Sequence, residues 1–384
     1  MYYGIRSVFI TPAYMPSADE MNCQLRIVNC QFVHYIYSMQ FLRLLLLPFS
    51  LLYGLILSFR NWLFDAGIKK TYIIPNRSVC VGNITVGGTG KSPMTIYLAN
   101  LLAEFHPAIL SRGYGRSTKG VRLANGDDTA ATIGDEPFMY YRRFGARIPV
   151  VVAEERKAGV ELLNAQFRNP TIILDDAFQH RHVKAKFQLV LMTYDRPVFR
   201  DFPFPAGNLR ENRSGIRRAD ALMITKCPEN LSEQAKADFL QQLKFDSRKV
   251  YFSHIVYGDL VPLSEADWKP VEKILLVTGI ANPLPLKKHL EKQYSVELMQ
   301  FPDHHAFTAK DIQTIHQKFD TFASRPSAIV TTEKDAVRLL AFGDHPLMSK
   351  APWFYQSMQV HIDRANDFND LLLNYVTGTD ERSR

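Results

Sequence analysis

The sequence predicts an α/β fold, in which a P-loop NTPase-like α/β/α sandwich is followed by a second, smaller α/β domain. Short apolar segments alternate with longer amphipathic segments, a rhythm typical of a parallel sheet covered by helices on both faces. A glycine-rich loop that ends in Gly-Lys-Ser lies between one apolar segment and a helical pattern. The 384 residues are enough for two domains of ordinary size.

The composition indicates a globular protein with a basic excess. Hydrophobic residues make up 46% of the chain and charged residues 22%, which argues against a disordered, collagen-like or polytopic membrane protein. The net charge of +8 favours an anionic partner but does not choose among nucleotide, phosphorylated substrate, nucleic acid and acidic lipid. The four cysteines lack zinc-site spacing, and a reducing compartment suits them best.

The predicted elements alternate along the body of the chain. Apolar segments typical of strands occupy residues 78–81, 108–110, 149–152, 171–174, 188–192, 221–225, 250–254, 273–278 and 328–331. Helical patterns occupy residues 92–104, 155–166, 232–243 and 309–322. A polar, proline-bearing stretch at 257–270 predicts a domain boundary. We expect an unstructured extension at 1–38, an apolar membrane-associating helix at 39–70, a P-loop domain at 71–262 and a second α/β domain at 263–384.

An uncharged, strongly apolar segment spans residues 44–59, between Arg43 and Arg60. As a helix it would be about 24 Å long, short of the ~30 Å hydrocarbon core, and Pro48 and Gly54 weaken it further as a spanning helix. A buried core helix, a secretory signal and an interfacial anchor are the three interpretations. No small-residue cleavage site follows, whereas an aromatic and basic flank does, so we favour an anchor at the membrane surface.

Residues 82–93, GNITVGGTGKSP, contain the end of a Walker A phosphate loop. In such loops glycines let backbone N–H groups wrap a phosphate, and the following helix presents its positive end. Lys91 can reach the outer phosphates of a nucleoside triphosphate, adenine or guanine, and the Ser92 hydroxyl can ligate Mg²⁺. The consensus has glycine where this chain has Thr85. The predicted nucleotide-binding residues are Thr85, Val86, Gly87, Gly88, Thr89, Gly90, Lys91 and Ser92.

Two acidic motifs follow the loop. Residues 171–180, TIILDDAFQH, form an apolar strand that ends in Asp175 and Asp176, a pattern typical of a Walker B element with a carboxylate near the metal. Residues 134–137, GDEP, form an acidic turn of the kind that also begins ordinary helices. On its own, this second motif does not indicate a site.

Two adjacent histidines lie in the second predicted domain. Residues 301–307, FPDHHAF, place Asp303, His304 and His305 side by side. A loop cap and an Asp–His pair that takes a proton from a hydroxyl are the two interpretations. The second suits a phosphoryl transfer, in which the attacking group loses a proton.

Taken in order, the motifs resemble those of the tetraacyldisaccharide 4′-kinase family. The matching stretches are VGNITVGGTGKSP (81–93), LSRGYGR (110–116), GDEP (134–137), LDDAFQH (174–180), PAGNLRE (205–211), TGIANP (278–283), FPDHHAF (301–307) and TTEKDAVRL (331–339). The ordered set is far more specific than any one motif. Two positions depart from the family pattern: Ala177 stands where Gly is usual, and Asn212 stands where Pro commonly ends the LREP motif.

The resemblance implies an activity and a place in the cell. It implies that ATP phosphorylates the 4′-hydroxyl of a tetraacyldisaccharide 1-phosphate, an acylated glucosamine disaccharide, to form lipid IVA in lipid A biosynthesis. It also implies a peripheral enzyme on the cytoplasmic face of the bacterial inner membrane and two α/β/α domains. We expect ATP and Mg²⁺ as cofactors, the lipid substrate and the membrane surface as partners, no nucleic acid, and a monomer.

The family's functional residues carry over to positions of this chain. Its GDEP aspartate pairs with the first histidine of DHH, which implies Asp135 and His304 here, with Lys91 and Asp303 as further catalytic candidates. The candidates for the magnesium site, without a choice of direct ligand, are Ser92, Glu136, Asp175 and Asp176. The substrate's 1-phosphate is anionic, so arginines near the cleft are expected. The candidates are Arg112, Arg116, Arg210 and Arg213.

The expected mechanism is in-line transfer of a phosphoryl group. Lys91 and Mg²⁺ hold the phosphates, and either His304 or Asp135 takes the 4′-hydroxyl proton. Because GDEP and DHH lie in different predicted domains, closure of the two domains would complete the active site and exclude water.

Two other functional classes stay open at this point. A membrane-associated P-loop ATPase that acts as a switch would also use an amphipathic helix, but Val86 stands where its early loop lysine is expected. A GTPase-like binding module would explain residues 224–226, ITK, after a strand, but Cys227 and Pro228 stand where its aspartate is needed.

Overall fold

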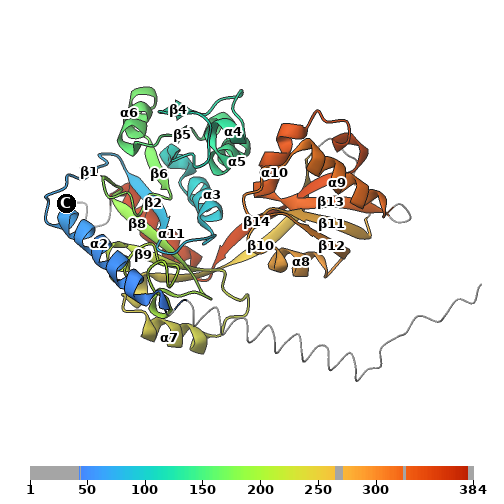
Figure 1. Cartoon of the computed structure of the whole chain (residues 1–384). Coiled ribbons are helices and arrows are strands. Elements are labelled where there is room, and N and C mark those ends of the chain that lie inside the picture. Colours follow the sequence, from blue (N-terminus) through green and yellow to red (C-terminus); the bar gives the residue numbers. More distant parts are fainter. Residues whose placement is uncertain (1–42, 44, 264–270, 323–325, 379–384) are drawn as a thin grey trace, which may run out of the picture.

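The structure, a computed structural model, describes residues 43, 45–263, 271–322 and 326–378. The predicted extension at 1–38 lies outside these residues, as does the second half of the predicted boundary stretch at 257–270. Figure 1 shows the described chain as two bodies of helices and strands.

The main helices and strands follow closely the predicted order. They are α2 (Leu47–Asp65), β1 (Tyr72–Ile73), β2 (Ser78–Asn83), α3 (Lys91–Leu101), β3 (Pro107–Ser111), β4 (Arg122–Leu123), α4 (Ala130–Ile133), α5 (Asp135–Phe144), β5 (Val150–Val152), α6 (Arg156–Gln166), β6 (Thr171–Asp175), β7 (Val183–Lys184), β8 (Phe187–Thr193), β9 (Ala221–Thr225), α7 (Glu233–Gln242), β10 (Val250–Pro262), β11 (Lys273–Thr278), α8 (Leu284–Leu290), β12 (Ser295–Gln300), α9 (Ala309–Asp320), β13 (Ser327–Thr332), α10 (Glu333–Leu339), β14 (Trp353–Ile362) and α11 (Ala365–Thr377). Each predicted strand and helix has a counterpart here. β12 and β14 lie outside the predicted strands.

One mostly parallel sheet runs through the molecule. Its twelve strands have the order β12-β11-β13-β14-β10-β9-β8-β2-β6-β3-β5-β4. Two neighbouring pairs are antiparallel, β10 with β14 and β4 with β5. The α/β class and the largely parallel sheet are therefore confirmed. The sequence did not indicate that a single hydrogen-bonded sheet joins both predicted domains.

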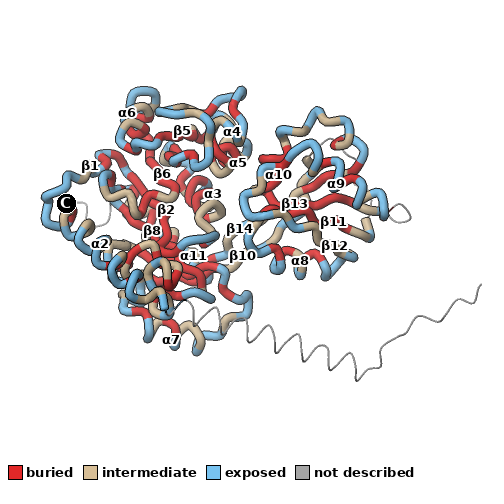
Figure 2. Tube along the Cα trace, viewed as in Figure 1, coloured by how far each residue is buried: buried red, intermediate tan, exposed pale blue. Residues whose placement is uncertain are grey.

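The two bodies are connected by β10 and β14 (Figure 1). The larger body holds α2 to α7 and α11, and the smaller body holds α8 to α10. β10 begins beside β9 in the larger body, and β14 begins beside β13 in the smaller one. Figure 2 shows buried strands at the centre of each body, with exposed loops and helix faces around them.

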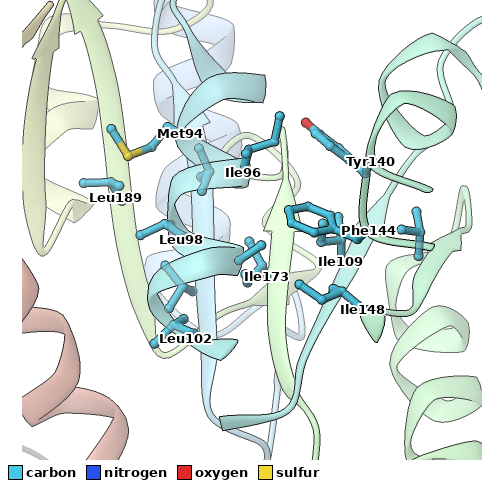
Figure 3. Close-up of a cluster of buried hydrophobic side chains, with 14 of the residues drawn as sticks. Met94, Ile96, Leu98, Leu102, Ile109, Tyr140, Phe144, Ile148, Ile173 and Leu189 are labelled. Atoms are coloured by element: carbon cyan, nitrogen blue, oxygen red, sulfur yellow. The ribbon is translucent and has the colours of Figure 1, made fainter. Parts of the chain in front are cut away.

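The core of the larger body lies on both faces of the sheet. Val79 and Val81 of β2 pack in one cluster, and Cys80 between them packs in the other, as the alternation of a strand requires. Figure 3 shows the first cluster, where Leu98 of α3 and Phe144 of α5 meet side chains of the strands. This packing fixes α3 and α5, whose amino-terminal ends carry predicted site residues.

The last helix, α11, returns to the larger body. Phe368 and Leu372 are fully buried in the same cluster as Val79, and the Tyr375 hydroxyl donates to the Ser78 carbonyl at 3.2 Å. The predicted domain division between residues 262 and 263 stays a prediction. In the structure α11, which follows that division, packs on the larger body.

Helix α2 turns a polar stripe toward the protein. Ser50, Gly54, Ser58, Asn61 and Asp65 lie on one face at helical spacing, and each contacts the larger body. Pro48 lies in the first turn, where the missing N–H leaves no helical bond unmade. Pro48 and Gly54 thus sit where the fold accommodates them, and their expected weakening of a membrane-spanning helix stays a prediction.

The opposite face of α2 is apolar and exposed. Its side chains, between 54% and 67% exposed, are Phe49, Leu51, Leu52, Leu55, Ile56, Phe59 and Trp62. By length and composition α2 is the one helix, among the described residues, that could cross a membrane, and little of it is buried. This N-terminal apolar helix is consistent with membrane association.

Candidate active site

The glycine-rich loop connects buried strand β2 to helix α3. Gly87 and Gly90 have φ values of +98° and +87°, which side chains other than glycine rarely adopt. Asn83 Nδ2 donates to Thr89 Oγ1 at 3.1 Å, and Thr225 Oγ1 donates to the Thr89 carbonyl at 2.8 Å. The loop is therefore held from β2 and β9, and Lys91 begins α3 directly after it.

The Thr85 position explains one departure from the phosphate-loop consensus. Thr85 is 3% exposed and forms an antiparallel bridge with Leu209 of the PAGNLRE motif. The Val86 N–H donates to the Asn208 carbonyl at 2.8 Å, and the Arg210 N–H donates to the Ile84 carbonyl at 2.8 Å. Because this part of the loop is extended and paired, its backbone does not require glycine.

Asp176, directly after β6, forms ion pairs with two cationic side chains. Lys91 Nζ lies 3.6 Å from Asp176 Oδ2, and Arg210 Nη1 lies 3.2 Å from Asp176 Oδ1. Asp176 itself has φ +50°, whereas its neighbour Ala177 is not among the described residues with positive φ. The change from glycine at 177 therefore places no side chain in the left-handed region, and loop geometry is kept.

Asp175 is buried among other carboxylates. The Ser111 hydroxyl donates to its Oδ2 at 3.3 Å. Burial, together with the charges of Glu136 and Asp176, raises the pKa of Asp175 to about 7. Mg²⁺ prefers oxygen ligands such as these carboxylates and the Ser92 hydroxyl at the start of α3. The residues predicted for magnesium thus fit that ion chemically.

Asp135 and His304 approach each other from different bodies. Asp135 begins α5, and His304 follows β12; Asp135 Oδ2 lies 3.6 Å from His304 Nδ1. The His304 N–H donates to the Gly279 carbonyl at 3.1 Å, so the TGIANP motif holds the DHH loop. The structure brings this predicted pair together.

Two cations of α10 at this place were not among the predicted site residues. Lys334 Nζ lies 3.0 Å from Glu136 Oε1 and 3.2 Å from His304 Nε2. Arg338 Nε donates to Asp135 Oδ2 at 2.8 Å. Both belong to the TTEKDAVRL motif, and their spacing of four residues on a helix would have placed them on one face.

The other residues of the DHH loop have different surroundings. Asp303 is exposed. His305 Nε2 lies 3.1 Å from Asp311 Oδ2, and its ring stacks on Phe301 with the centroids 4.7 Å apart. Asp311 also caps α9 through Thr308, so His305 has the loop-capping contact that was one interpretation of this motif.

The predicted substrate arginines are placed differently from one another. Arg210 faces Asp176, as described above, and Arg112 is exposed. The Arg116 side chain is 2% exposed and pairs with Glu154. Arg213 donates to the Asp201 carbonyl at 2.9 Å and lies over the Phe202 ring. Of these four arginines, only Arg210 has a described side-chain contact with the acidic edge, the group formed by Glu136, Asp175 and Asp176.

Comparisons with known proteins identify the family of this chain. The chain matches the family described as tetraacyldisaccharide-1-P 4′-kinase over residues 42–377. It is 40% identical over 346 residues to the tetraacyldisaccharide 4′-kinase of Flavobacterium johnsoniae, covering 88% of this chain and 98% of that protein. The corresponding protein of Bacteroides thetaiotaomicron is 38% identical over 357 residues, covering 86% and 92%.

A solved structure matches as well. It is the crystal structure of LpxK from Aquifex aeolicus, described as an "apo" form in complex with ATP. The TM-score is 0.68 at 29% sequence identity, covering 87% of this chain and 99% of that one. Family, full-length relatives and fold therefore agree, and the chain belongs to the tetraacyldisaccharide 4′-kinase family, the kinases of lipid A biosynthesis.

Proposed function

We propose that this protein is an ATP-dependent tetraacyldisaccharide 4′-kinase that forms lipid IVA. The observation that carries the proposal is the meeting of a phosphate loop with an Asp–His pair drawn from two bodies of the fold. Asp135 Oδ2 and His304 Nδ1 lie 3.6 Å apart, and Lys91 begins the helix after the loop. The relatives named for the same activity, and the ATP in the Aquifex structure, support it.

The phosphate loop supplies the groups that bind ATP. Backbone N–H groups of residues 87–92, beyond the Val86 N–H that is paired with Asn208, and the amino-terminal end of α3 attract the phosphates. Lys91 adds a mobile positive charge, for which Asp176 at 3.6 Å is the partner in this structure. Arg210, on the same carboxylate, is placed to meet a phosphate of either substrate.

The acidic edge supplies the groups for the metal. Ser92, Glu136, Asp175 and Asp176 are the residues that would hold Mg²⁺. When bound, that ion neutralises charge on the phosphates. Lys334 contacts Glu136 in this structure, so one cation already balances part of this negative charge.

The Asp135–His304 pair handles the proton of the acceptor. The 4′-hydroxyl loses its proton to His304 or to Asp135, its oxygen forms a bond to the γ-phosphorus, and the bond from that phosphorus to the β-phosphate bridge breaks to leave ADP. Asp303, exposed beside His304, adds negative charge to this loop. Because the pair spans the two bodies, closure of the kinase domain at 71–262 against the α8 to α10 part of the second domain proposed at 263–384 assembles the site.

The lipid substrate requires the enzyme to work at a membrane surface. The acyl chains stay in the bilayer, and the exposed apolar face of α2 is suited to bind there. We propose a peripheral, monomeric enzyme at the cytoplasmic face of the inner membrane, where ATP is available. Arg112 and Arg210 are the arginines whose surroundings leave them most able to meet the 1-phosphate.

The test is transfer of label. Purified protein is incubated with γ-labelled ATP, Mg²⁺ and the disaccharide 1-phosphate in detergent, and label is followed into the lipid. We expect transfer by the wild-type protein and a loss of at least about 100-fold for Lys91→Met and for His304→Ala. Protein that binds ATP but never labels the glycolipid would contradict the proposal. Turnover of ATP without any glycolipid would favour a switch ATPase instead.

A further inference from the structure

One buried arginine contacts both members of the proton-handling pair. Arg338 of α10 has a side chain that is 7% exposed. Its Nε donates to Asp135 Oδ2 at 2.8 Å, and its Nη2 lies 3.3 Å from His304 Nδ1. Its third nitrogen, Nη1, donates to Asp335 Oδ1 at 2.9 Å. A single guanidinium therefore touches groups on α5, on the DHH loop and on α10.

The guanidinium is anchored from the smaller body. Asp335 is fully buried, and its Oδ2 accepts from the Gly279 N–H at 3.0 Å and from the Thr332 hydroxyl at 2.7 Å. Gly279 also binds the His304 backbone. Asp335, which anchors Arg338, and the His304 backbone therefore both bind Gly279, so one segment of the smaller body holds the two side chains.

The chemistry of arginine suits a positioning role. A guanidinium stays charged, donates in fixed directions and does not accept a proton, so it can orient a base without competing for the proton. The neighbouring Lys334 meets His304 at the other ring nitrogen, Nε2, at 3.2 Å. A neutral imidazole accepts a hydrogen bond at only one ring nitrogen. Arg338 and Lys334 therefore also influence which nitrogen of His304 carries the proton and which can accept one.

We propose that Arg338 is a positioning residue of the transfer reaction, which holds the Asp135 carboxylate of the larger body in register with His304 of the smaller body. This inference rests on the proposed kinase function. Arg338 need not touch either substrate. Its loss would misplace the pair and lower the rate of chemistry while ATP binding at the loop stays intact.

The same interface offers a matched control. Arg143 of α5 pairs with Glu333 of α10 at 2.8 Å, and among the described residues neither side chain forms a hydrogen bond or ion pair with Asp135 or His304. Arg143→Met therefore removes an ion pair between the same two helices without touching the proton-handling pair. It reports what weaker docking of the two bodies does by itself.

The experiment measures kcat and KM with the full chain. For Arg338→Ala we expect kcat to fall about 10- to 100-fold, with the KM and the Kd for ATP within about twofold of wild type. Arg143→Met is expected to keep kcat within about threefold. Guanidinium, at concentrations that leave the wild-type protein folded, should restore part of the rate to Arg338→Ala and none to Arg143→Met.

A second variant guards against loss of folding. Arg338→Lys keeps the charge but not the fork that reaches three groups at once, so its kcat should also fall. Thermal unfolding shows whether each variant folds. A wild-type kcat in Arg338→Ala, or equal losses in Arg338→Ala and Arg143→Met without rescue, would overturn the inference. If the wild-type protein does not label the lipid at all, the proposed function fails instead.

Discussion

At the scale of single residues, Thr85, which departs from the phosphate-loop consensus, and Asn212, which departs from the family pattern, each have a local partner. Thr85 pairs with Leu209 in a short bridge. Asn212 Nδ2 donates to the Gly54 carbonyl at 2.9 Å and to the Ser58 hydroxyl, so this side chain holds α2 where proline could not. These changes alter how loops and helices are joined, and they leave Lys91 and its acidic partners in place.

Replacing Asn212 tests its role in holding α2. We expect Asn212→Ala to weaken docking of the helix by about 1 kcal/mol, because two hydrogen bonds across the seam are lost. Amide hydrogen exchange within α2 should then become about fivefold faster, while exchange in the buried strand β2 stays unchanged.

A second substitution controls for general loosening. Ser58→Ala removes only the hydroxyl that Asn212 contacts. If Asn212 and Ser58 act through the hydrogen bond they share, exchange in the double variant is slower than the sum of the two single effects predicts. If they act independently, the two effects add. Unchanged exchange in Asn212→Ala would show that the apolar contacts alone hold the helix.

Residue chemistry also sets how much of the site the sequence could predict. Lys91 and Asp175 follow from motifs whose residue types already state their chemistry, whereas the Asp135–His304 pair was implied only by the resemblance to the kinase family. Arg338 does not follow from its residue type, because an arginine within a helix is usually a surface residue. Only the fold shows that the Arg338 side chain is 7% exposed and lies between two carboxylates. One is Asp135, 203 positions earlier in the chain, and the other is Asp335, one helical turn away.

At the scale of elements, α2 has its polarity reversed relative to a helix of a soluble domain. Its polar stripe faces the protein and its apolar face is exposed. We expect the triple variant Leu51→Ser, Leu55→Ser and Phe59→Ser to bind phospholipid vesicles at least about tenfold more weakly, since each buried apolar side chain contributes about 1.5–3 kcal/mol. Co-sedimentation with vesicles measures this.

An exposed leucine elsewhere provides the control for that variant. Leu284, 56% exposed in α8 of the smaller body, is replaced by Ser, and vesicle binding is expected to stay the same. Activity on detergent-dispersed substrate should survive in both proteins. Vesicle binding that is as tight in the triple variant as in wild type would remove α2 as the membrane contact.

Elements with apolar sequences were predictable, and half-exposed ones were not. The strands of the P-loop body are buried on both faces and are continuous apolar segments, as in β6 and β8. β12 has no buried residue, and β14 is buried at its start and end but partly or fully exposed in between. Because these strands contain polar residues, a prediction based on apolar segments does not find them.

At the scale of the whole molecule, one histidine should make the fold sensitive to acid. Burial, with the nearby charges of Arg156 and other basic groups, lowers the pKa of His180 to about 4. The unfolded chain binds this proton near pH 6.5 and the folded chain does not, so this group lowers the free energy of unfolding as pH falls from about 6.5 to 4.

Urea unfolding checks the direction of this effect. We expect His180→Gln to gain stability relative to wild type between pH 7 and pH 5, because the variant has no such proton to exclude. His182, whose ring lies 6.0 Å from His180, provides the matched variant His182→Gln. A difference between wild type and His180→Gln that does not change with pH would contradict the assignment.

The strands that join the two bodies have a mechanical consequence. β10 and β14 are hydrogen-bonded over most of their length, with an irregular register between Tyr257 and Leu260. Such a ribbon resists stretching yet twists easily, and an irregularity of this kind localises the bend. The ribbon therefore constrains the spacing between the two bodies more than their relative angle, which in this structure is held by the contacts between α5 and α10. We therefore expect torsion of this ribbon, rather than sliding, to change the separation of the phosphate loop and His304.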